Sequence, residues 1–269
     1  MELSKQKLCI IGGGNLGTAL AKGIAGKGII PASNIIVTRR HVNQLGGLSA
    51  AGFQIMSDNQ AAVSQSAIVI LCVQPKQLTN VIDEIRDVTK ADHIFISTMA
   101  GTSIELISEQ LGKPAVIMRA MPNTASAVGE SMTCLAANAK DKEYITVAEQ
   151  LFETIGDTLR IEESLMQAAT VLGASGIAYF MRYLRAATQG GIQMGFHPEE
   201  AQRIAVQTAK GAAMLVMEHG SHPEVEIDKV TTPQGCTIEG LNEMEHQGFS
   251  SALIKGLMTS YYKLFNIRS

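Results

Sequence analysis

The start of the chain constrains the fold most, because a strand, a glycine turn and a helix follow one another there without a gap. The apolar run Leu8–Ile11 leads directly into GGGNLG at positions 12–17. After it, apolar residues recur every three or four positions, as on one face of a helix. A Gly-x-Gly-x-x-Gly motif between a strand and a helix is typical of folds that bind a dinucleotide.

Each glycine of this motif has a physical role. Gly12 permits the tight turn, Gly14 lets a pyrophosphate approach the backbone, and Gly17 lets the helix pack against the strand. The helix N-terminus offers free N–H groups to the phosphate. The alternative is a glycine turn that serves packing alone. The residues predicted to bind the cofactor here are Gly12, Gly14, Asn15, Leu16 and Gly17.

The end of the second predicted strand bears on which dinucleotide binds. The β-branched run Ile35–Thr38 ends in Arg39 and Arg40, and no acidic residue lies between Asn34 and Ser57. A fold that selects NAD usually places Asp or Glu here to bind the ribose 2′-hydroxyl, whereas arginines bind a 2′-phosphate. We therefore expect NADPH as the cofactor, with NADH as the alternative. The other interpretation is a solvated basic strand end.

Length and composition favour a two-domain protein of the cytoplasm. The 269 residues carry 22 Lys and Arg against 25 Asp and Glu, and 46% are hydrophobic. No extended basic cluster predicts nucleic-acid binding, and no uninterrupted apolar run reaches the ~18 residues of a membrane span. The polar N-terminus does not resemble a signal peptide, and four scattered cysteines fit reduced thiols in a cytoplasmic protein.

Alternating strands and helices predict a doubly wound α/β sheet in the first part of the chain. Further strands are expected near 67–73, 93–97, 115–118, 132–137 and 158–161, with Asp141 as the N-cap of one intervening helix. From residue 164 onward the pattern is helical. The segment 165–194 is apolar nearly all round, which indicates burial against a partner subunit. We predict a cofactor domain over 1–161 and a helical domain over 162–269 that dimerises and completes the active site.

Loops at the carboxyl ends of parallel strands are expected to hold the ligand. Three such loops follow the glycine turn, at Val73-Gln74-Pro75-Lys76, at Ser97–Gly101 and at Arg119–Thr124. The small residues of the second leave room for a nicotinamide ring against the backbone. Each of these loops can also be an ordinary turn.

A different kind of loop, Val230–Thr237, leads into a predicted helix and carries hydroxyls and a glycine. Helix N-termini bind anions such as carboxylates. The alternative is that Thr237 only caps the helix.

Small residues near 172–179 indicate close helix packing or a substrate pocket. The six histidines show no metal-binding spacing, so we predict no metal site.

These motifs, in this order and spacing, resemble the pyrroline-5-carboxylate reductase family over almost the whole chain. The resemblance implies a Rossmann domain, an interlocking helical dimer domain, NAD(P)H as hydride donor and proline synthesis as the activity. It implies that the loop holding Thr232, Gly235 and Cys236 binds the substrate carboxylate and that Thr237 hydrogen-bonds the ring nitrogen. It also implies substrate contact from Ser175. The remaining implied cofactor contacts are Asn59, Val73, Gln74, Pro75, Met99, Ala100, Gly101 and Asn123.

The chain departs from the family pattern at several positions. Gln74 stands where the family usually has Lys, Ala125 where it has Pro, and Gln234 where it has Gly. Ile177 interrupts the family's Gly-Ser-Gly-Pro-Ala-Tyr segment.

Two rival functions follow from the same fold. A β-hydroxyacid dehydrogenase also joins a Rossmann domain to a helical one, but it commonly needs a lysine base in the first long helix of the second domain. Segment 165–194 has no lysine. A dinucleotide-sensing regulator without turnover is the other rival, because fold alone does not fix function.

Overall fold

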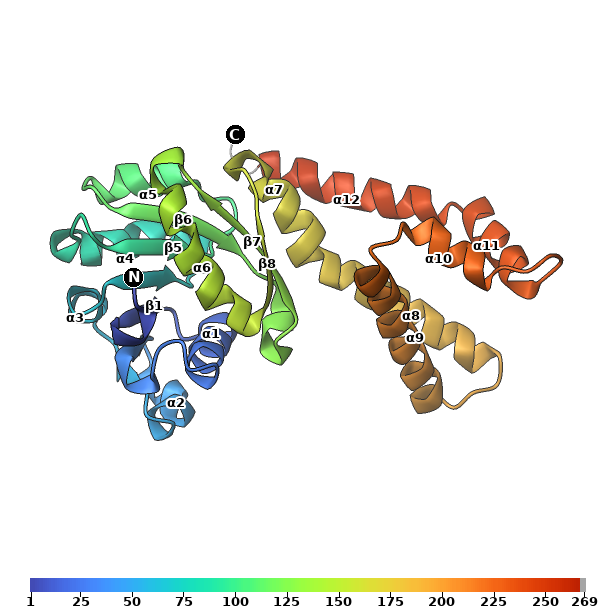
Figure 1. Cartoon of the computed structure of the whole chain (residues 1–269), viewed down its shortest axis with the longest axis horizontal. Coiled ribbons are helices and arrows are strands. Elements are labelled where there is room, and N and C mark those ends of the chain that lie inside the picture. Colours follow the sequence, from blue (N-terminus) through green and yellow to red (C-terminus); the bar gives the residue numbers. More distant parts are fainter. Residues whose placement is uncertain (267–269) are drawn as a thin grey trace. The chain divides into compact units, whose positions relative to one another are not determined.

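The computed structural model describes residues 1–266; residues 267–269, the end of the predicted second domain, lie outside the described part. Within it, eight strands form one sheet in the order β3-β2-β1-β4-β5-β6-β7-β8 (Figure 1). All neighbours pair in parallel except β6 and β7, which pair antiparallel. The strands are β1 (Leu8–Ile11), β2 (Ile35–Thr38), β3 (Gln54–Met56), β4 (Ile68–Leu71), β5 (Ile94–Ser97), β6 (Val116–Met121), β7 (Ser131–Ala137) and β8 (Gly156–Arg160).

Helices cover both faces of this sheet and create two hydrophobic cores. Along β1, Leu8 and Ile10 belong to the core under α1 and α6, whereas Cys9 and Ile11 belong to the core under α3, α4 and α5. Burial on both faces explains why β1, β2 and β4 are almost wholly apolar. The helices are α1 (Asn15–Gly26), α2 (Gly46–Ala50), α3 (Asn59–Ser64), α4 (Leu78–Ile85), α5 (Ile104–Leu111), α6 (Ile145–Phe152) and α7 (Met166–Ala169).

The predicted fold class is confirmed, with differences in detail. The short β3 and the helices α2 and α3 were not predicted, because segment 39–66 is polar and lacks a clear period. The predicted N-cap role of Asp141 is wrong. Asp141 lies buried inside a 3₁₀ turn, its carboxylate accepts from the Ile117 N–H at 3.4 Å, and α6 begins after Tyr144.

One nearly continuous helical stretch runs from Glu163 to Gln193, and it changes its winding on the way. A 3₁₀ turn and α7 lead into one π-helical turn, Thr170–Ser175, and α8 (Gly176–Gln193) follows. Wider π turns are rare and often lie at functional sites. By length and composition alone this stretch could cross a membrane, a test that core helices also pass.

The chain divides into two compact units, Met1–Ser175 with the end of the chain from Leu264, and Gly176–Lys263. Residues 162–175, which the sequence assigns to the helical domain, belong to the first unit. The predicted boundary between 161 and 162 stays a prediction. In the second unit α8 packs along α9 (Figure 1). The bounds of the helices after α8 are α9 (Pro198–His219), α10 (Pro223–Val230), α11 (Cys236–His246) and α12 (Phe249–Asn266).

The turn between α10 and α11 contains a strained residue. Gln234 has φ +60°, and among the described residues it is the one non-glycine with a positive φ. The Gly235 N–H donates to the Thr232 carbonyl at 2.9 Å, so the turn closes with Pro233 and Gln234 in its centre. A left-handed backbone costs an L-residue roughly 1–2 kcal/mol, and glycine avoids this cost.

We expect Gln234→Gly to stabilise the protein. The relief of the left-handed conformation exceeds the extra chain entropy that glycine gives the unfolded state, and the net gain is about 0.5–1 kcal/mol. Gln234→Ala keeps the Cβ atom, so its free energy of unfolding should stay near wild type. Thermal and urea unfolding of the three proteins test this. Equal stability of the glycine and alanine variants would contradict the strain.

Candidate active site

The glycine turn after β1 is built from two backbone contacts that leave no room for a side chain. Gly12 has φ +108°, and a Cβ atom on it would lie 2.4 Å from the Cys72 carbonyl oxygen. A Cβ atom on Gly17 would lie 2.3 Å from the Gly12 carbonyl oxygen. Any larger residue at either position would push β4 or α1 away from the turn.

Gly14 differs from these two glycines, because a Cβ atom there would meet nothing within 4 Å. Gly14 is also the N-cap of α1, so Asn15 and Leu16 form the first helical turn, whose N–H groups have no acceptor within the helix. An open approach next to free N–H groups suits a pyrophosphate. The observed geometry therefore fits a dinucleotide, and the contacts of Gly12 and Gly17 explain why these two positions need glycine.

The end of β2 brings two predicted cofactor residues to the same turn. Arg39 Nη1 donates to the Gly13 carbonyl at 2.7 Å, whereas Arg40 is exposed. Asn59, at the start of α3, accepts from the Thr38 hydroxyl at 2.6 Å and donates to Glu84 at 2.6 Å. Arg39 thus contacts the glycine turn, whereas the Arg40 side chain is exposed beside it in sequence.

The next two loops continue along the same edge of the sheet. Val73 is partly buried after β4, whereas Gln74 and Pro75 are exposed at the start of a 3₁₀ turn. After β5, Thr98 donates to the Leu71 carbonyl at 3.0 Å, which ties the second loop to the first.

The remaining residues of the loop after β5 are held in fixed positions. Met99 is buried, and Ala100 packs against a small core of Met121, Cys134, Ala136 and Met166. Gly101 has φ +69° and ends the loop. The side chains of this segment are therefore packed into the protein, which leaves its backbone as a surface for a nicotinamide ring.

Asn123 follows β6 and connects the edge of the sheet to the π turn. Its side-chain oxygen accepts from the Ala125 N–H at 2.9 Å, and its Nδ2 donates to the Gly173 carbonyl at 3.3 Å. Gly173 and Ser175 both belong to the π turn. The predicted cofactor residue Asn123 and the predicted substrate residue Ser175 therefore come from neighbouring segments of one unit.

A buried ion pair beside these loops was not predicted as part of the site. Arg119 Nη1 lies 3.3 Å from Glu163 Oε1, and the two side chains are 3% and 27% exposed. The same carboxylate oxygen accepts from the Ile104 N–H at 2.8 Å. Neither residue stands in a local pattern that indicates such a pair, because 44 positions separate them.

The second unit carries the predicted substrate loop. Gly235 is tightly placed, since a Cβ atom on it would lie within 2.4 Å of the Thr232 hydroxyl oxygen. Gly235 is the N-cap of α11, and Cys236 and Thr237 form its first turn. The alternative in which Thr237 caps the helix is therefore wrong. The Gly235 N–H is already bonded to Thr232, whereas the N–H groups of Cys236, Thr237 and Ile238 at the helix start have no acceptor within the helix.

The helix before this loop is anchored by a charged cluster. Glu226 of α10 accepts from Lys229 at 2.7 Å and from Ser221 at 2.5 Å, and His219 lies 3.3 Å away. The hydrogen bonds from Lys229 and Ser221 lower the pKa of Glu226 to about 2. The carboxylate is therefore charged at neutral pH and joins the end of α9 to α10.

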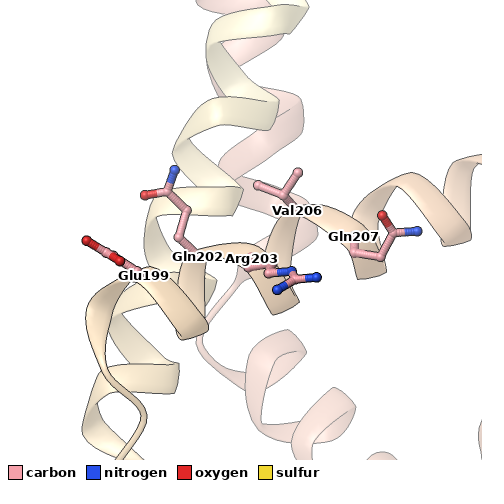
Figure 2. Close-up of a pocket in the computed structure, with 5 residues that line it drawn as sticks. All are labelled: Glu199, Gln202, Arg203, Val206 and Gln207. Carbon is pink, nitrogen blue, oxygen red and sulfur yellow. The ribbon is translucent and has the colours of Figure 1, made fainter.

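Figure 2 shows a hollow beside α9 that the predicted site residues do not line. Its lining residues are Glu199, Gln202, Arg203, Val206 and Gln207, all from one helix. Side chains from a single helix offer no enclosed cavity for a small substrate. The hollow is a feature of the helical unit rather than a second candidate site.

The topology explains which predicted residues come together. The strands β1, β2, β4, β5 and β6 are parallel and neighbouring, so the loops that follow them meet at one edge. Every predicted cofactor residue follows one of these strands or begins α3 beside them. The Thr232–Thr237 loop forms a separate compact turn in the second unit.

Two family models match the chain. Residues 7–101 match a family described as NADP oxidoreductase, coenzyme F420-dependent. Residues 163–264 match the family described as pyrroline-5-carboxylate reductase dimerisation. The first match covers the glycine turn through the loop after β5, and the second covers the helical part of the chain.

Two relatives from Dictyostelium discoideum are similar over nearly all of this chain. Pyrroline-5-carboxylate reductase 1 is 46% identical over 97% of this chain, which spans about half (49%) of that relative's length. Pyrroline-5-carboxylate reductase 2 is 42% identical and is matched over 97% of this chain and 92% of its own.

Solved structures agree with these matches. The pyrroline-5-carboxylate reductase of Coxiella burnetii has a TM-score of 0.91 and 28% identity, covering 97% of this chain and 98% of its own. The Plasmodium falciparum pyrroline carboxylate reductase with NADP bound has a TM-score of 0.85 and 25% identity, covering 99% of this chain and all of its own. This chain belongs to the pyrroline-5-carboxylate reductase family and is an NADP-binding oxidoreductase of the Rossmann type.

Proposed function

We propose that the chain reduces 1-pyrroline-5-carboxylate to L-proline, the last step of proline biosynthesis, with NAD(P)H as the hydride donor. One observation carries the proposal: pyrroline-5-carboxylate reductase 2 of Dictyostelium discoideum is 42% identical to this chain and is aligned over 92% of its own length. The glycine turn, which fits a pyrophosphate, supports the cofactor.

The cofactor, when bound, supplies a hydride to the carbon of the C=N bond. The chain's own residues bind and orient the reactants. The glycine turn and the first turn of α1 hold the pyrophosphate, Arg40 contacts the 2′-phosphate, and the loop after β5 supports the nicotinamide. Met99 is 1% exposed, so water is kept from the back of that loop.

The substrate needs a partner at its ring nitrogen and an anion site for its carboxylate. We assign the nitrogen to the Thr237 hydroxyl and the carboxylate to the N–H groups of Cys236 and Thr237. A protonated imine accepts hydride more readily, so a hydrogen bond that orients this nitrogen favours the reaction. Thr232 and Gly235 shape the turn that presents these groups.

The rival functions are less well supported. A β-hydroxyacid dehydrogenase needs a base, and the stretch from residue 165 to 194 offers Arg182 and Arg185 but no lysine. A regulator without turnover would keep the fold and lose the reaction. NADPH oxidation with pyrroline-5-carboxylate, with a hydroxyacid and with neither distinguishes the three. Turnover with the imine acid alone is the expected result, and no turnover would overturn the proposal.

We propose that the enzyme works in the cytoplasm on a small molecule, without nucleic acid or membrane. The four cysteines are free in the structure, and burial raises the pKa of Cys72 to about 12, which keeps that thiol neutral. Reduced thiols fit a reducing compartment.

Cofactor choice is expected to depend on Arg39 and Arg40. Arg39→Asp combined with Arg40→Ala should raise the KM for NADPH about 10- to 100-fold more than the KM for NADH, since a charge-assisted bond contributes about 1.5–3 kcal/mol. Arg39 also bonds to Gly13, so some loss with both cofactors is expected. The difference between the two KM changes isolates the contact with the 2′-phosphate. Equal KM increases for NADPH and NADH would contradict that contact. Arg40→Ala alone should show most of the difference.

Thr237 is expected to act on the substrate rather than on folding. Thr237→Ala should lower kcat/KM for pyrroline-5-carboxylate about tenfold or more, or about 1.4 kcal/mol of transition-state stabilisation. Because Gly235 is the N-cap, the melting temperature should change little. Thr237→Ser keeps the hydroxyl and should keep most activity. Near wild-type turnover by the alanine variant would end this assignment.

The protein is a homo-oligomer through its dimerisation domain, and we propose a dimer as the smallest unit. In the single chain Leu172, Phe180 and Met194 are 70%, 72% and 77% exposed. A monomer would leave this apolar surface in water. Light scattering of the purified protein should give at least twice the chain mass of 28.7 kDa. A stable, active monomer would contradict the proposal.

A further inference from the structure

Glu163 joins two segments that are far apart in sequence. Its Oε1 accepts from the N–H of Ile104, the first residue of α5, at 2.8 Å. The same oxygen lies 3.3 Å from Nη1 of Arg119 on β6. The bond from Ile104 to the carboxylate is short, and a buried arginine needs an opposite charge nearby. Glu163 therefore fixes the start of α5 to β6.

Both ends of the loop after β5 are tied to β6, one directly and the other through Glu163. At one end Ser97 pairs in register with Arg119 in the sheet. At the other end, Ile104 donates to the carboxylate that Arg119 contacts. The segment between them, residues 98–103, contains the predicted nicotinamide surface. The sheet thus fixes the start of the loop, and the bond from Ile104 to Glu163 fixes its end.

The same carboxylate begins the stretch that carries the π turn. Glu163 opens the 3₁₀ turn before α7, and Met166 of α7 lies in the small core against which Ala100 packs. Further along, the Gly173 carbonyl accepts from Asn123. Glu163 therefore ties the end of the loop after β5 to the start of this stretch, and Asn123, which follows β6, ties the sheet edge to the π turn.

We infer that Glu163, oriented by Arg119, is a positioning residue for hydride transfer. It sets the place of the nicotinamide-side loop (residues 98–103) against the π turn that carries Ser175. The effect on hydride transfer rests on the proposed function, whereas the contacts of Glu163 with Ile104 and Arg119 are present without cofactor. Misplacement of a reacting group by about 1 Å can cost about 100-fold in rate. Loss of the Arg119–Glu163 pair should therefore lower kcat more than it weakens NADPH binding.

The experiment compares Glu163→Ala with Glu162→Ala. Glu162 is the adjacent carboxylate, is 74% exposed and pairs with Lys142 at 3.4 Å, so it controls for the loss of one charge. Hydrogen exchange of a peptide spanning 97–106, in the protein without cofactor, reports the loop directly. Loss of the acceptor for Ile104 should speed exchange at least fivefold in Glu163→Ala and leave Glu162→Ala unchanged.

Kinetics and binding then give a second measure. Glu163→Ala should lower kcat at least tenfold, while the Kd for NADPH, from cofactor fluorescence, stays within threefold because the adenosine half binds elsewhere. Glu163→Gln keeps an acceptor for Ile104 and loses only the charge toward Arg119, so its kcat should lie between wild type and alanine. Glu162→Ala should keep kcat within twofold.

Several results would overturn the inference: unchanged exchange at 97–106, an equal response of both alanine variants, or a Kd that rises as much as kcat falls. If the wild-type protein does not reduce pyrroline-5-carboxylate, the proposed function fails instead. The exchange comparison still decides in that case whether Glu163 holds the loop. Should Glu163→Ala unfold, Glu163→Gln provides the same exchange and kinetic comparisons with a conserved side-chain shape.

Discussion

The close approach of three backbone segments at the glycine turn is the contact on which the rest of the structure depends. The Cys72 carbonyl occupies the place of a Gly12 side chain, and the Gly12 carbonyl occupies that of Gly17. These contacts bring β1, β4 and the start of α1 together without intervening side chains. The same absence of side chains leaves the N-terminus of α1 open at Gly14. Packing and cofactor binding are thus served by one set of residues, which is why the motif tolerates so little change.

From that turn, a second constraint extends across the sheet. Parallel neighbours place their carboxyl ends at one edge, and the order β2-β1-β4-β5-β6 puts four further loops beside the glycine turn. Hydrogen bonds then tie some of these loops to their neighbours. Thr98 bonds to Leu71, and Asn123 bonds to Gly173 of the π turn. A site assembled from separate loops needs such links, because each loop alone is a short, mobile connection.

Periodicity predicted the parts of the fold that are long or strongly apolar. The strands from Leu8, Ile35 and Ile68 and the amphipathic helix α4 follow directly from it. The strand β3 has three partly exposed residues and offers no such pattern. The cap assigned to Asp141 failed because a 3₁₀ turn takes up that residue. The pairing of Arg119 with Glu163 depends on tertiary structure and has no local signature, whereas the glycine turn has a strong one.

The loop before α11 shows how a departure from the family pattern can be accommodated. The family usually has glycine where Gln234 stands, and Gln234 nevertheless adopts the left-handed backbone that glycine favours. The neighbouring contacts explain why. Gly235 lies against Thr232 too closely for any other residue, and the hydrogen bond between them closes the turn. These contacts hold the turn closed around Pro233 and Gln234, with Gln234 in the left-handed conformation. A cost of roughly 1–2 kcal/mol is small beside the ~5–15 kcal/mol stability of a typical protein. The N-terminus of α11, and with it Thr237, keeps its place because the turn overrides the preference of the residue inside it.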